Sequence, residues 1–254
     1  MTSNPSAVAQ ALLAAHRQRT PIDADASAGA IASAEDAYTV QDLVLRELEP
    51  AVAVARWWKS GGPSREGLLP HAPLPAAGVW ASPAVAGDWH FNFCLVEAEI
   101  ALRVGRDVTP AQAAALTGDS AADLIDAMTV TIELVDARWQ QRAAAPGLLK
   151  LADLQAHGAL VVGPWVPFAP RDWSAQSCSV TIGRQPPRDF RGTHAMGNPA
   201  APLPVWLRHL SRHGATVPAG TAVTTGTWCG MLPTERGDLV TVRFDGVGEA
   251  SVQL

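Results

Sequence analysis

The chain has 254 residues, 48% of them hydrophobic, which suffices for one large domain or two small ones with a packed core. Its formal net charge of −5 and isoelectric point of about 5.8 exclude the basic surface that nucleic acid or an anionic membrane would attract. Three cysteines without CxxC spacing argue against a disulfide framework and favour a cytoplasmic protein.

Two helices are predicted at the start of the chain. The first follows Asn4-Pro5, a capping residue and a proline at the first helical position, and runs to about Arg19. The second begins at Ser33, whose capping partner is Asp36, and carries apolar residues at helical spacing. No basic stretch followed by an apolar stretch occurs here, so we expect no signal peptide.

A long irregular stretch then separates the helices from the strands. A short strand is expected over residues 52–58, followed by residues 60–87, which are rich in Gly, Pro and Ala and have little periodicity. We interpret this stretch as either a lid or a loosely ordered loop. The uncharged stretch 154–170 contains glycines and three prolines, so no membrane helix is expected there.

The rest of the chain is predicted to be mostly strand. We expect a capped helix start at Thr109-Pro110 with Gln112, and helices over 119–128 and 203–213. Strands are expected over 91–104, 129–135, 160–166, 222–225, 239–244 and 249–254. Strands outnumber helices after residue 88 and do not alternate regularly with them. An α+β fold therefore fits better than a doubly wound sheet.

The strand FNFCLVEAEIALRV, residues 91–104, carries two acids on one face. Side chains alternate along a strand, so Cys94, Val96 and the following even-numbered apolar residues form the core face. Glu97 and Glu99 share the other face, roughly 6–7 Å apart. Two carboxylates held so close repel each other, and a divalent cation between them would remove that cost.

Glu133 likewise projects from the polar face of a strand, in TVTIELVD, where Val130, Ile132 and Leu134 form the apolar face. Three carboxylates from two strands would suit a hard cation such as Mg²⁺ or Mn²⁺ and leave coordination positions for substrate and water. A Glu-x-Glu pair on an amphipathic strand can also be a solvated face, and spacing alone does not group Glu133 with the pair.

The order of several motifs resembles one family. VEAEIALRVGRDV and IELVDAR resemble the two acidic segments of 2-keto-4-pentenoate hydratases and 4-oxalocrotonate decarboxylases, a branch of the fumarylacetoacetate-hydrolase superfamily. AYTVQ, WWKSG, LADLQAHGALVVG, MGNP, PVWLRHL, VPAGTAVTTGT and the closing GDLVTVRFDGVGEASVQL resemble further family segments in the same order. The resemblance spans almost the whole chain from about residue 10.

The resemblance implies that Glu97, Glu99 and Glu133 bind one divalent metal, Mg²⁺ or Mn²⁺. It also implies that Lys59, one of only two lysines, contacts the substrate carboxylate or the catalytic water. Asp153 is retained from a family motif and is taken as catalytic.

Further substrate contacts are expected from Trp58 beside Lys59, and from Thr225 and Gly226 in VTTGT.

The family fold is a mixed, mostly β roll with flanking helices. We expect an N-terminal helical region, 1–60, and a metal-binding catalytic β-roll domain, 61–254, in one continuous structural unit. A homo-oligomer is expected, and a complex with another enzyme of an aromatic meta-cleavage pathway is a further possibility.

Some polar residues of the family pattern are missing. Ser60–Pro63 replace a Gly-Leu-Thr-Ser run, and the loop segment LLPHAPLPAAGVW lacks the usual acid. Leu154 and Ala156 stand where the family has Asn and Ser, and Thr221 replaces an Asp. Either the substrate differs or other residues substitute.

Two histidines are candidates to substitute for the missing groups. His90 and His71 lie near the loop and the acidic strand, and histidine suits proton transfer near neutral pH. Each can equally be an ordinary surface or half-buried histidine. The block of tryptophans around them is expected to pack the irregular stretch, with a substrate wall as the alternative.

The sequence thus predicts a metal-dependent lyase that adds water to a 2-hydroxydienoate, a 2-oxo acid tautomer, and yields a 4-hydroxy-2-oxo acid. Decarboxylation of a 2-oxo-enedioate and hydrolysis of an acylpyruvate C–C bond are alternatives on the same site. A non-catalytic protein that binds a keto acid or supports a partner subunit is an alternative of another class.

Overall fold

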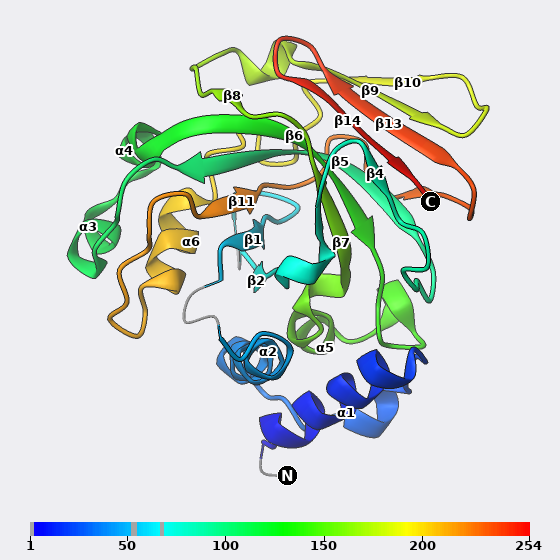
Figure 1. Cartoon of the computed structure of the whole chain (residues 1–254). Coiled ribbons are helices and arrows are strands. Elements are labelled where there is room, and N and C mark those ends of the chain that lie inside the picture. The colour runs from blue at the N-terminus through cyan, green and yellow to red at the C-terminus, as the bar shows by residue number, and fades with distance from the viewer. Residues whose placement is uncertain (1–2, 52–54, 67–68) are drawn as a thin grey trace.

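Two curled β-sheets with helices at their margins make up residues 3–51, 55–66 and 69–254, the part of the chain that the computed structural model describes (Figure 1). The α-helices are α1 Pro5–Gln18, α2 Ala34–Leu48, α3 Pro110–Ala115, α4 Gly118–Ala121, α5 Gly147–Ala152 and α6 Leu203–Leu210. The longer strands are β5 Leu95–Val104, β6 Ile125–Val135, β7 His157–Val162, β9 Ser177–Ile182, β13 Leu239–Phe244 and β14 Gly248–Gln253. The short strands are β1 Trp57–Ser60, β2 His71–Pro73, β3 Val79–Ala81, β4 Ala84–Val85, β8 Val166–Pro167, β10 Arg188–Arg191, β11 Ala222–Thr224 and β12 Leu232–Pro233.

The larger sheet carries all three predicted acids. Within the described residues its strand order is β2-β1-β11-β5-β6-β7-β3, with β12 beside β5 and β8 beside β6. The antiparallel pair β5–β6 forms its centre and sets Glu97 directly opposite Glu133. Lys59 on β1 pairs with Thr224 on β11, whose other neighbour is β5. Four strands thus bring polar residues to one face of the sheet.

The smaller sheet, in the order β10-β9-β13-β14-β4, packs against the opposite face. Its inward residues, among them Val180, Val240 and Phe244, join Val130 and Ile132 of β6 in the main buried core. This burial explains the alternation found in the sequence, because the even-numbered residues of β5 and residues 128, 130, 132 and 134 of β6 enter that core.

The N-terminal helices form a second core with α5 at one end of the larger sheet (Figure 1). Asn4 caps α1, and Ser33 and Asp36 form the predicted capping box of α2. Buried side chains of α1 and α2, such as Leu12 and Val40, pack around the fully buried Trp139. The α+β fold with flanking helices is confirmed.

Three predicted boundaries differ from the structure. The helix expected over 119–128 ends by Leu124, because residues 125–128 extend β6 and pair with β5. The last helix ends at Leu210 rather than His213, and a turn leads to Gly214. The strand expected over 52–58 lies partly outside the described residues, and β1 covers Trp57–Ser60.

The stretch 60–87, apart from residues 67–68 outside the described part, is more regular than predicted. It contains β2, β3 and β4, which pair with β1, β7 and β14 respectively. Its strands have only two or three residues, too few for an alternating pattern, so the periodicity test missed them. The expectation of a lid or loose loop is therefore wrong for residues 71–73, 79–81 and 84–85, whereas residues 61–66 have no regular secondary structure.

Candidate active site

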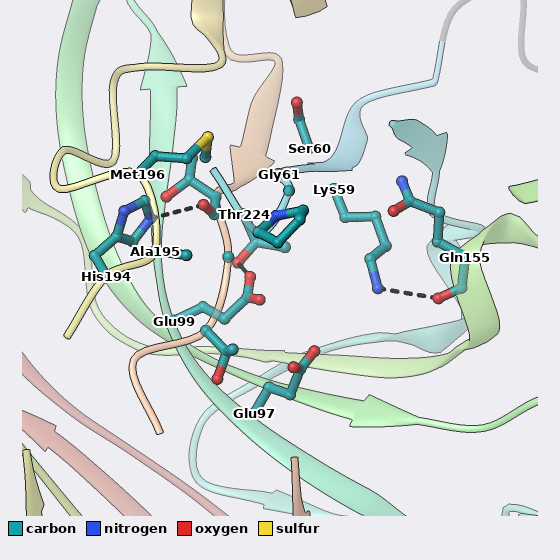
Figure 2. Close-up of a pocket in the computed structure, with 15 residues that line it drawn as sticks. Lys59, Ser60, Gly61, Glu97, Glu99, Gln155, His194, Ala195, Met196 and Thr224 are labelled. Atoms are coloured by element: carbon teal, nitrogen blue, oxygen red, sulfur yellow. Dashed lines mark hydrogen bonds between the residues drawn. The ribbon is translucent and has the colours of Figure 1, made fainter. Parts of the chain in front are cut away.

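The three predicted acids converge on one point. Carboxylate oxygens of Glu97, Glu99 and Glu133 all lie within 4.8 Å of one another. Antiparallel pairing sets Glu97 against Glu133. The two-residue step along β5 puts Glu99 on the same face as Glu97, and Figure 2 shows these two acids. Spacing within β5 predicted the first pair, but only the register between β5 and β6 brings the third acid to it.

Burial makes these carboxyl groups costly to ionise together. Burial first, and then the charge of Glu133, raises the pKa of Glu97 to about 7. Burial and the neighbouring glutamates raise the pKa of Glu99 to about 8. Glu133 is fully buried, and its Oε2 atom has no hydrogen-bond partner. An unpaired buried oxygen and repelling neighbours fit a site for a hard divalent cation, which these three carboxylates could hold.

Lys59 lies beside the acids. Its ammonium is 2.5 Å from Glu133 Oε1 and donates to the main-chain oxygen of Gln155 at 3.2 Å (Figure 2). Against the opposing effect of burial, the glutamates raise the pKa of Lys59, and the Lys59 charge keeps the pKa of Glu133 low. Lys59 therefore stays positively charged in the pocket, which the predicted contact with a substrate carboxylate requires.

Two threonines orient Glu99. Thr224 on β11 donates to Glu99, and its hydroxyl is 2.8 Å from that of Thr131, which lies opposite Glu99 in the β5–β6 register. An ionised Glu99, as a metal ligand would be, can only accept, so the chain of donors then runs from Thr131 through Thr224 to Glu99. Sequence reasoning missed both threonines. Their position on the same strand faces as the acids was the available signal.

The pocket above the acids has a volume of about 250 Å³. The lining residues are Lys59, Ser60, Gly61, Gly62, Pro63, Glu97, Glu99, Gln155, His194, Ala195, Met196, Thr224, Thr225, Gly226 and Thr227. The predicted substrate-binding residues Thr225 and Gly226 are among them. Gln155 and His194 were not predicted to line it.

Thr225 and His194 support the pocket through the main chain. The Thr225 hydroxyl donates to the Ile100 carbonyl oxygen, and the Thr225 carbonyl lies 2.8 Å from His194 Nε2. Gly226 has a φ of 106°, a conformation that favours glycine. These contacts hold the end of β11, which carries Thr224, against β5.

Strand alternation directs two other candidates away from the pocket. Trp58 precedes Lys59 on β1, so its side chain faces the opposite side, where it is buried and donates to the Ala55 carbonyl oxygen. His71 pairs with Ser60 and is 2.7 Å from its hydroxyl, on that same far side. The predicted substrate contact of Trp58 and the proton-transfer role considered for His71 have no support in this geometry.

Asp153 and His90 also lie outside the pocket. Asp153 is 1% exposed and forms an ion pair with Arg138, so its carboxylate is already engaged. His90 is exposed, with Nε2 3.3 Å from the Asn92 side-chain oxygen, and lines a separate surface depression. The family motif suggested Asp153, and proximity to the loop and the acidic strand suggested His90. Neither lines the pocket at the acids, and their catalytic roles stay predictions.

Comparison with known proteins agrees with this architecture. The profile of the fumarylacetoacetate (FAA) hydrolase C-terminal family matches residues 81–254. The chain belongs to the FAA hydrolase family. The match covers the strands that carry Glu97, Glu99 and Glu133, and begins after Lys59.

Curated relatives within the FAA hydrolase family are named hydratases. The chain is 27% identical over 164 residues to 2-keto-4-pentenoate hydratase of Paraburkholderia xenovorans strain LB400. It is 31% identical over 165 residues to 2-keto-4-pentenoate hydratase 1 of Dechloromonas aromatica strain RCB. The alignments cover 62% and 61% of this chain and 58% of each relative's length.

Solved structures share the fold at low identity. The 4-oxalocrotonate decarboxylase of Pseudomonas putida G7, complexed with magnesium and adipate, superposes with a TM-score of 0.81 at 20% identity, over 97% of this chain and 95% of that one. The fumarylpyruvate hydrolase of Pseudomonas aeruginosa, in complex with Mn²⁺ and pyruvate, gives 0.54 at 19% identity, over 79% and 89%. The near-complete overlap with the first structure includes the N-terminal helices.

Proposed function

We propose that this protein is a metal-dependent hydratase that converts a 2-hydroxydienoate into a 4-hydroxy-2-oxo acid. The observation that carries the proposal is the convergence of three carboxylates, one half-buried and two buried, within 4.8 Å of one another and beside a lysine ammonium in a small pocket. The hydratase names of the curated relatives support the choice of reaction.

Glu97, Glu99 and Glu133 are proposed to hold the metal, with Mg²⁺ or Mn²⁺ as the ion. All three ligands are hard oxygen donors, which these ions prefer, and solved relatives in the fold family are complexed with magnesium or Mn²⁺. A bound divalent cation would supply positive charge to the substrate C2 oxygen as it becomes negative.

Lys59 is proposed to bind the substrate carboxylate. Its ammonium lies at the edge of the pocket, where Glu133 and the Gln155 carbonyl oxygen hold it in place. A cation fixed in this way needs little reorganisation when a carboxylate arrives. The walls contributed by Thr225, Gly226 and Met196 then confine the carbon chain.

The reaction needs two proton movements and one water. The enol proton at C2 is lost and C5 gains a proton, which leaves the C3–C4 double bond conjugated with the C2 carbonyl. Water then forms a bond to C4 while C3 gains a proton. Residues of the pocket hold the dienoate planar, exclude bulk water and keep the carboxylate at Lys59.

The charge of the pocket favours a monocarboxylate over a dicarboxylate. Among the described lining residues, Lys59 is the only Lys or Arg, and it already faces Glu133. A 2-oxo-enedioate would bring a second carboxylate with no cation to meet it, and desolvating that charge is costly. We therefore rank hydration above decarboxylation of a diacid.

The test is a direct assay of the purified protein with Mg²⁺ or Mn²⁺. 2-Hydroxypentadienoate, 4-oxalocrotonate and an acylpyruvate are the substrates, and NMR identifies each product. We expect 4-hydroxy-2-oxopentanoate from the first substrate as the fastest reaction. Faster release of CO₂ from 4-oxalocrotonate, or binding of all three without turnover, would contradict the proposal.

Replacing a metal ligand provides the second test. The substitution Glu97→Gln should reduce Mn²⁺ affinity by at least about tenfold and abolish turnover, because the amide carries no charge to balance the cation. Glu249→Gln is the control, since Glu249 is exposed on the other sheet. Calorimetric titration with Mn²⁺ measures the affinity, and full activity in the Glu97 variant would exclude the proposed site.

A further inference from the structure

An unusual backbone turn lies beside the active-site lysine. Leu154, Gln155 and Ala156, which precede β7, have φ angles of 46°, 54° and 58°. Only five non-glycine residues in the described part of the chain have positive φ, and three of them are this consecutive run. Each such residue is strained, because its Cβ atom crowds the neighbouring carbonyl oxygen. Surrounding contacts must therefore hold the turn in place.

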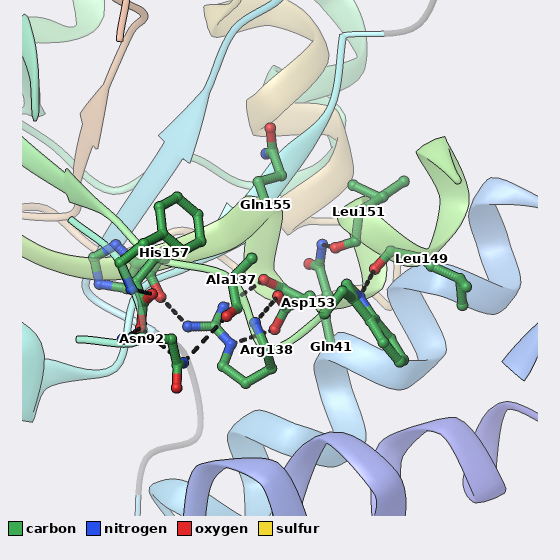
Figure 3. A network of polar contacts seen from close by, with 12 residues as sticks. Gln41, Asn92, Ala137, Arg138, Leu149, Leu151, Asp153, Gln155 and His157 are labelled. Carbon is green, nitrogen blue, oxygen red and sulfur yellow. Dashed lines mark hydrogen bonds and ion pairs between the residues drawn. The ribbon is translucent and has the colours of Figure 1, made fainter. Parts of the chain in front are cut away.

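One buried side chain joins the two ends of this turn. Arg138 donates through Nη2 to the main-chain oxygen of Asp153 at 2.8 Å, and through Nη1 to that of His157 (Figure 3). These are the residues directly before and after the turn. The guanidinium Nε also pairs with the Asp153 carboxylate, which accepts in addition from the Arg138 main-chain N–H at 2.8 Å.

The contacts around Arg138 are shielded from solvent. Arg138, Asp153 and His157 are 4%, 1% and 4% exposed, so their hydrogen bonds do not compete with bulk water. A planar guanidinium can reach the carboxylate and both carbonyl oxygens at once, whereas an ammonium is a single point donor. The shape of arginine is thus matched to the spacing of the ends of the turn.

The turn presents a carbonyl group to the active site. The Gln155 main-chain oxygen accepts from the Lys59 ammonium at 3.2 Å (Figure 2). With its side-chain oxygen turned toward β2, Gln155 also accepts from the N–H groups of His71 and Ala72 at 3.2 and 3.3 Å. Relaxation of the turn to a right-handed conformation would rotate the peptide and remove the neutral partner of Lys59.

We propose that the buried Arg138–Asp153 pair is a positioning device for Lys59, acting through the left-handed turn 154–156. Neither residue touches the pocket. The pair holds the Gln155 carbonyl toward the ammonium, so that Lys59 is shared between this oxygen and Glu133. The importance of the device for catalysis rests on the proposed function, but its structural part is testable without any substrate.

The experiment compares Arg138→Lys with the double variant Arg138→Lys, Ala156→Gly. Only two lysines occur in the sequence, so the wild-type protein labelled with [¹³C]lysine gives two ε-methylene NMR signals, which Lys150→Arg assigns. Each Arg→Lys variant adds a third signal, and Lys59→Arg in the same variant identifies the signal of Lys59. We expect the Lys59 signal to move in the single variant. It should return in the double variant, because glycine adopts the left-handed conformation without the clamp.

Arg103→Lys is the matched control. Arg103 also pairs with an aspartate, donating through Nε and Nη2 to the two carboxylate oxygens of Asp126 at 2.9 and 2.8 Å, but it lies on the surface and contacts no residue of the turn. The Arg103→Lys substitution should leave the Lys59 signal unchanged. With a substrate that is turned over, Arg138→Lys should lower kcat/KM by about tenfold or more at unchanged Mn²⁺ affinity, and the added glycine should restore most of it.

Two results would overturn the proposal. One is an unmoved Lys59 signal in a folded Arg138→Lys protein, and the other is a moved signal that Ala156→Gly does not restore. If Arg138→Lys fails to fold, Asp153→Asn replaces it in the same comparison. Absence of hydratase activity in the wild type would remove the proposed function but not affect the NMR result, so the two failures are distinguishable.

Discussion

The ion pair between Lys59 and Glu133 defines the active site at the scale of single residues. The two side chains are 12% and 0% exposed, so neither charge is well solvated without the other. Removing one partner of such a pair leaves an uncompensated buried charge, which costs about 3–5 kcal/mol. Lys59 and the glutamates beside it therefore depend on one another, and residues that contact the glutamates, such as Thr224, also affect how they are oriented.

Thr224→Val tests the role of the threonine chain. Valine keeps the shape but removes the hydroxyl that donates to Glu99, so this ligand loses its orienting partner. We expect Mn²⁺ to bind about tenfold more weakly. We also expect a loss of about 1–3 kcal/mol of stability, because the buried Thr131 hydroxyl and Glu99 each lose a hydrogen-bond partner. Calorimetric titration measures the change, and Thr241→Val on β13 of the other sheet is the control. An unchanged dissociation constant would show that Thr224 does not orient Glu99.

At the scale of elements, the site depends on the close packing of β5, β6 and β7. Glu133 lies opposite both Glu97 on β5 and Leu160 on β7. Gly158 allows β7 to approach, because a Cβ atom there would be 2.6 Å from the Leu134 carbonyl oxygen. A backbone atom cannot move aside as a side chain could, so the position requires glycine.

Gly158→Ala should therefore destabilise the protein by about 3 kcal/mol. Gly147→Ala is the matched control, since a Cβ atom at Gly147, in α5, meets nothing within 4 Å. The control should be unchanged or up to about 0.5 kcal/mol more stable, because alanine favours helix. Urea unfolding measures both, and equal stability of the two variants would contradict the packing argument.

In the molecule as a whole, His209 connects an N-terminal helix with the larger sheet. His209 of α6 lies with its ring centre 4.2 Å from that of Tyr38 of α2, and 5.9 Å from that of Trp58 of β1. Burial, and secondly the charge of Arg212, lowers the pKa of His209 to about 2.

The predicted division at residue 60 and the predicted oligomer and partner complex stay predictions. None of the described helices combines the length and hydropathy needed for a transmembrane span.

The buried histidine predicts a pH dependence of stability. Below pH 6.5 the unfolded chain binds a proton at His209 that the native state does not, so stability present above 6.5 is lost as the pH falls. The loss per histidine is about 1.4 kcal/mol per pH unit. His209→Gln should reduce the slope of unfolding free energy against pH by this amount. Tyr38→Phe is the control, and an unchanged slope in the His209 variant would contradict the assignment.

The sequence by itself determined the parts of this protein that depend on local periodicity. Alternation along residues 91–104 put Glu97 and Glu99 on one face, and capping residues marked the starts of α1 and α2. The order of motifs indicated the FAA hydrolase family, which the profile match confirms. The alternation and the caps follow from neighbours within a few residues along the chain, and the order of motifs is read directly from the sequence.

Only the tertiary structure decided which polar residues meet. The β5–β6 register joined Glu133 to the pair, and β11 brought Thr224 to Glu99 across 125 positions of sequence. Contacts between distant segments also paired Asp153 with Arg138, outside the pocket. Strand order and register are set by packing between distant segments, and no local pattern encodes them.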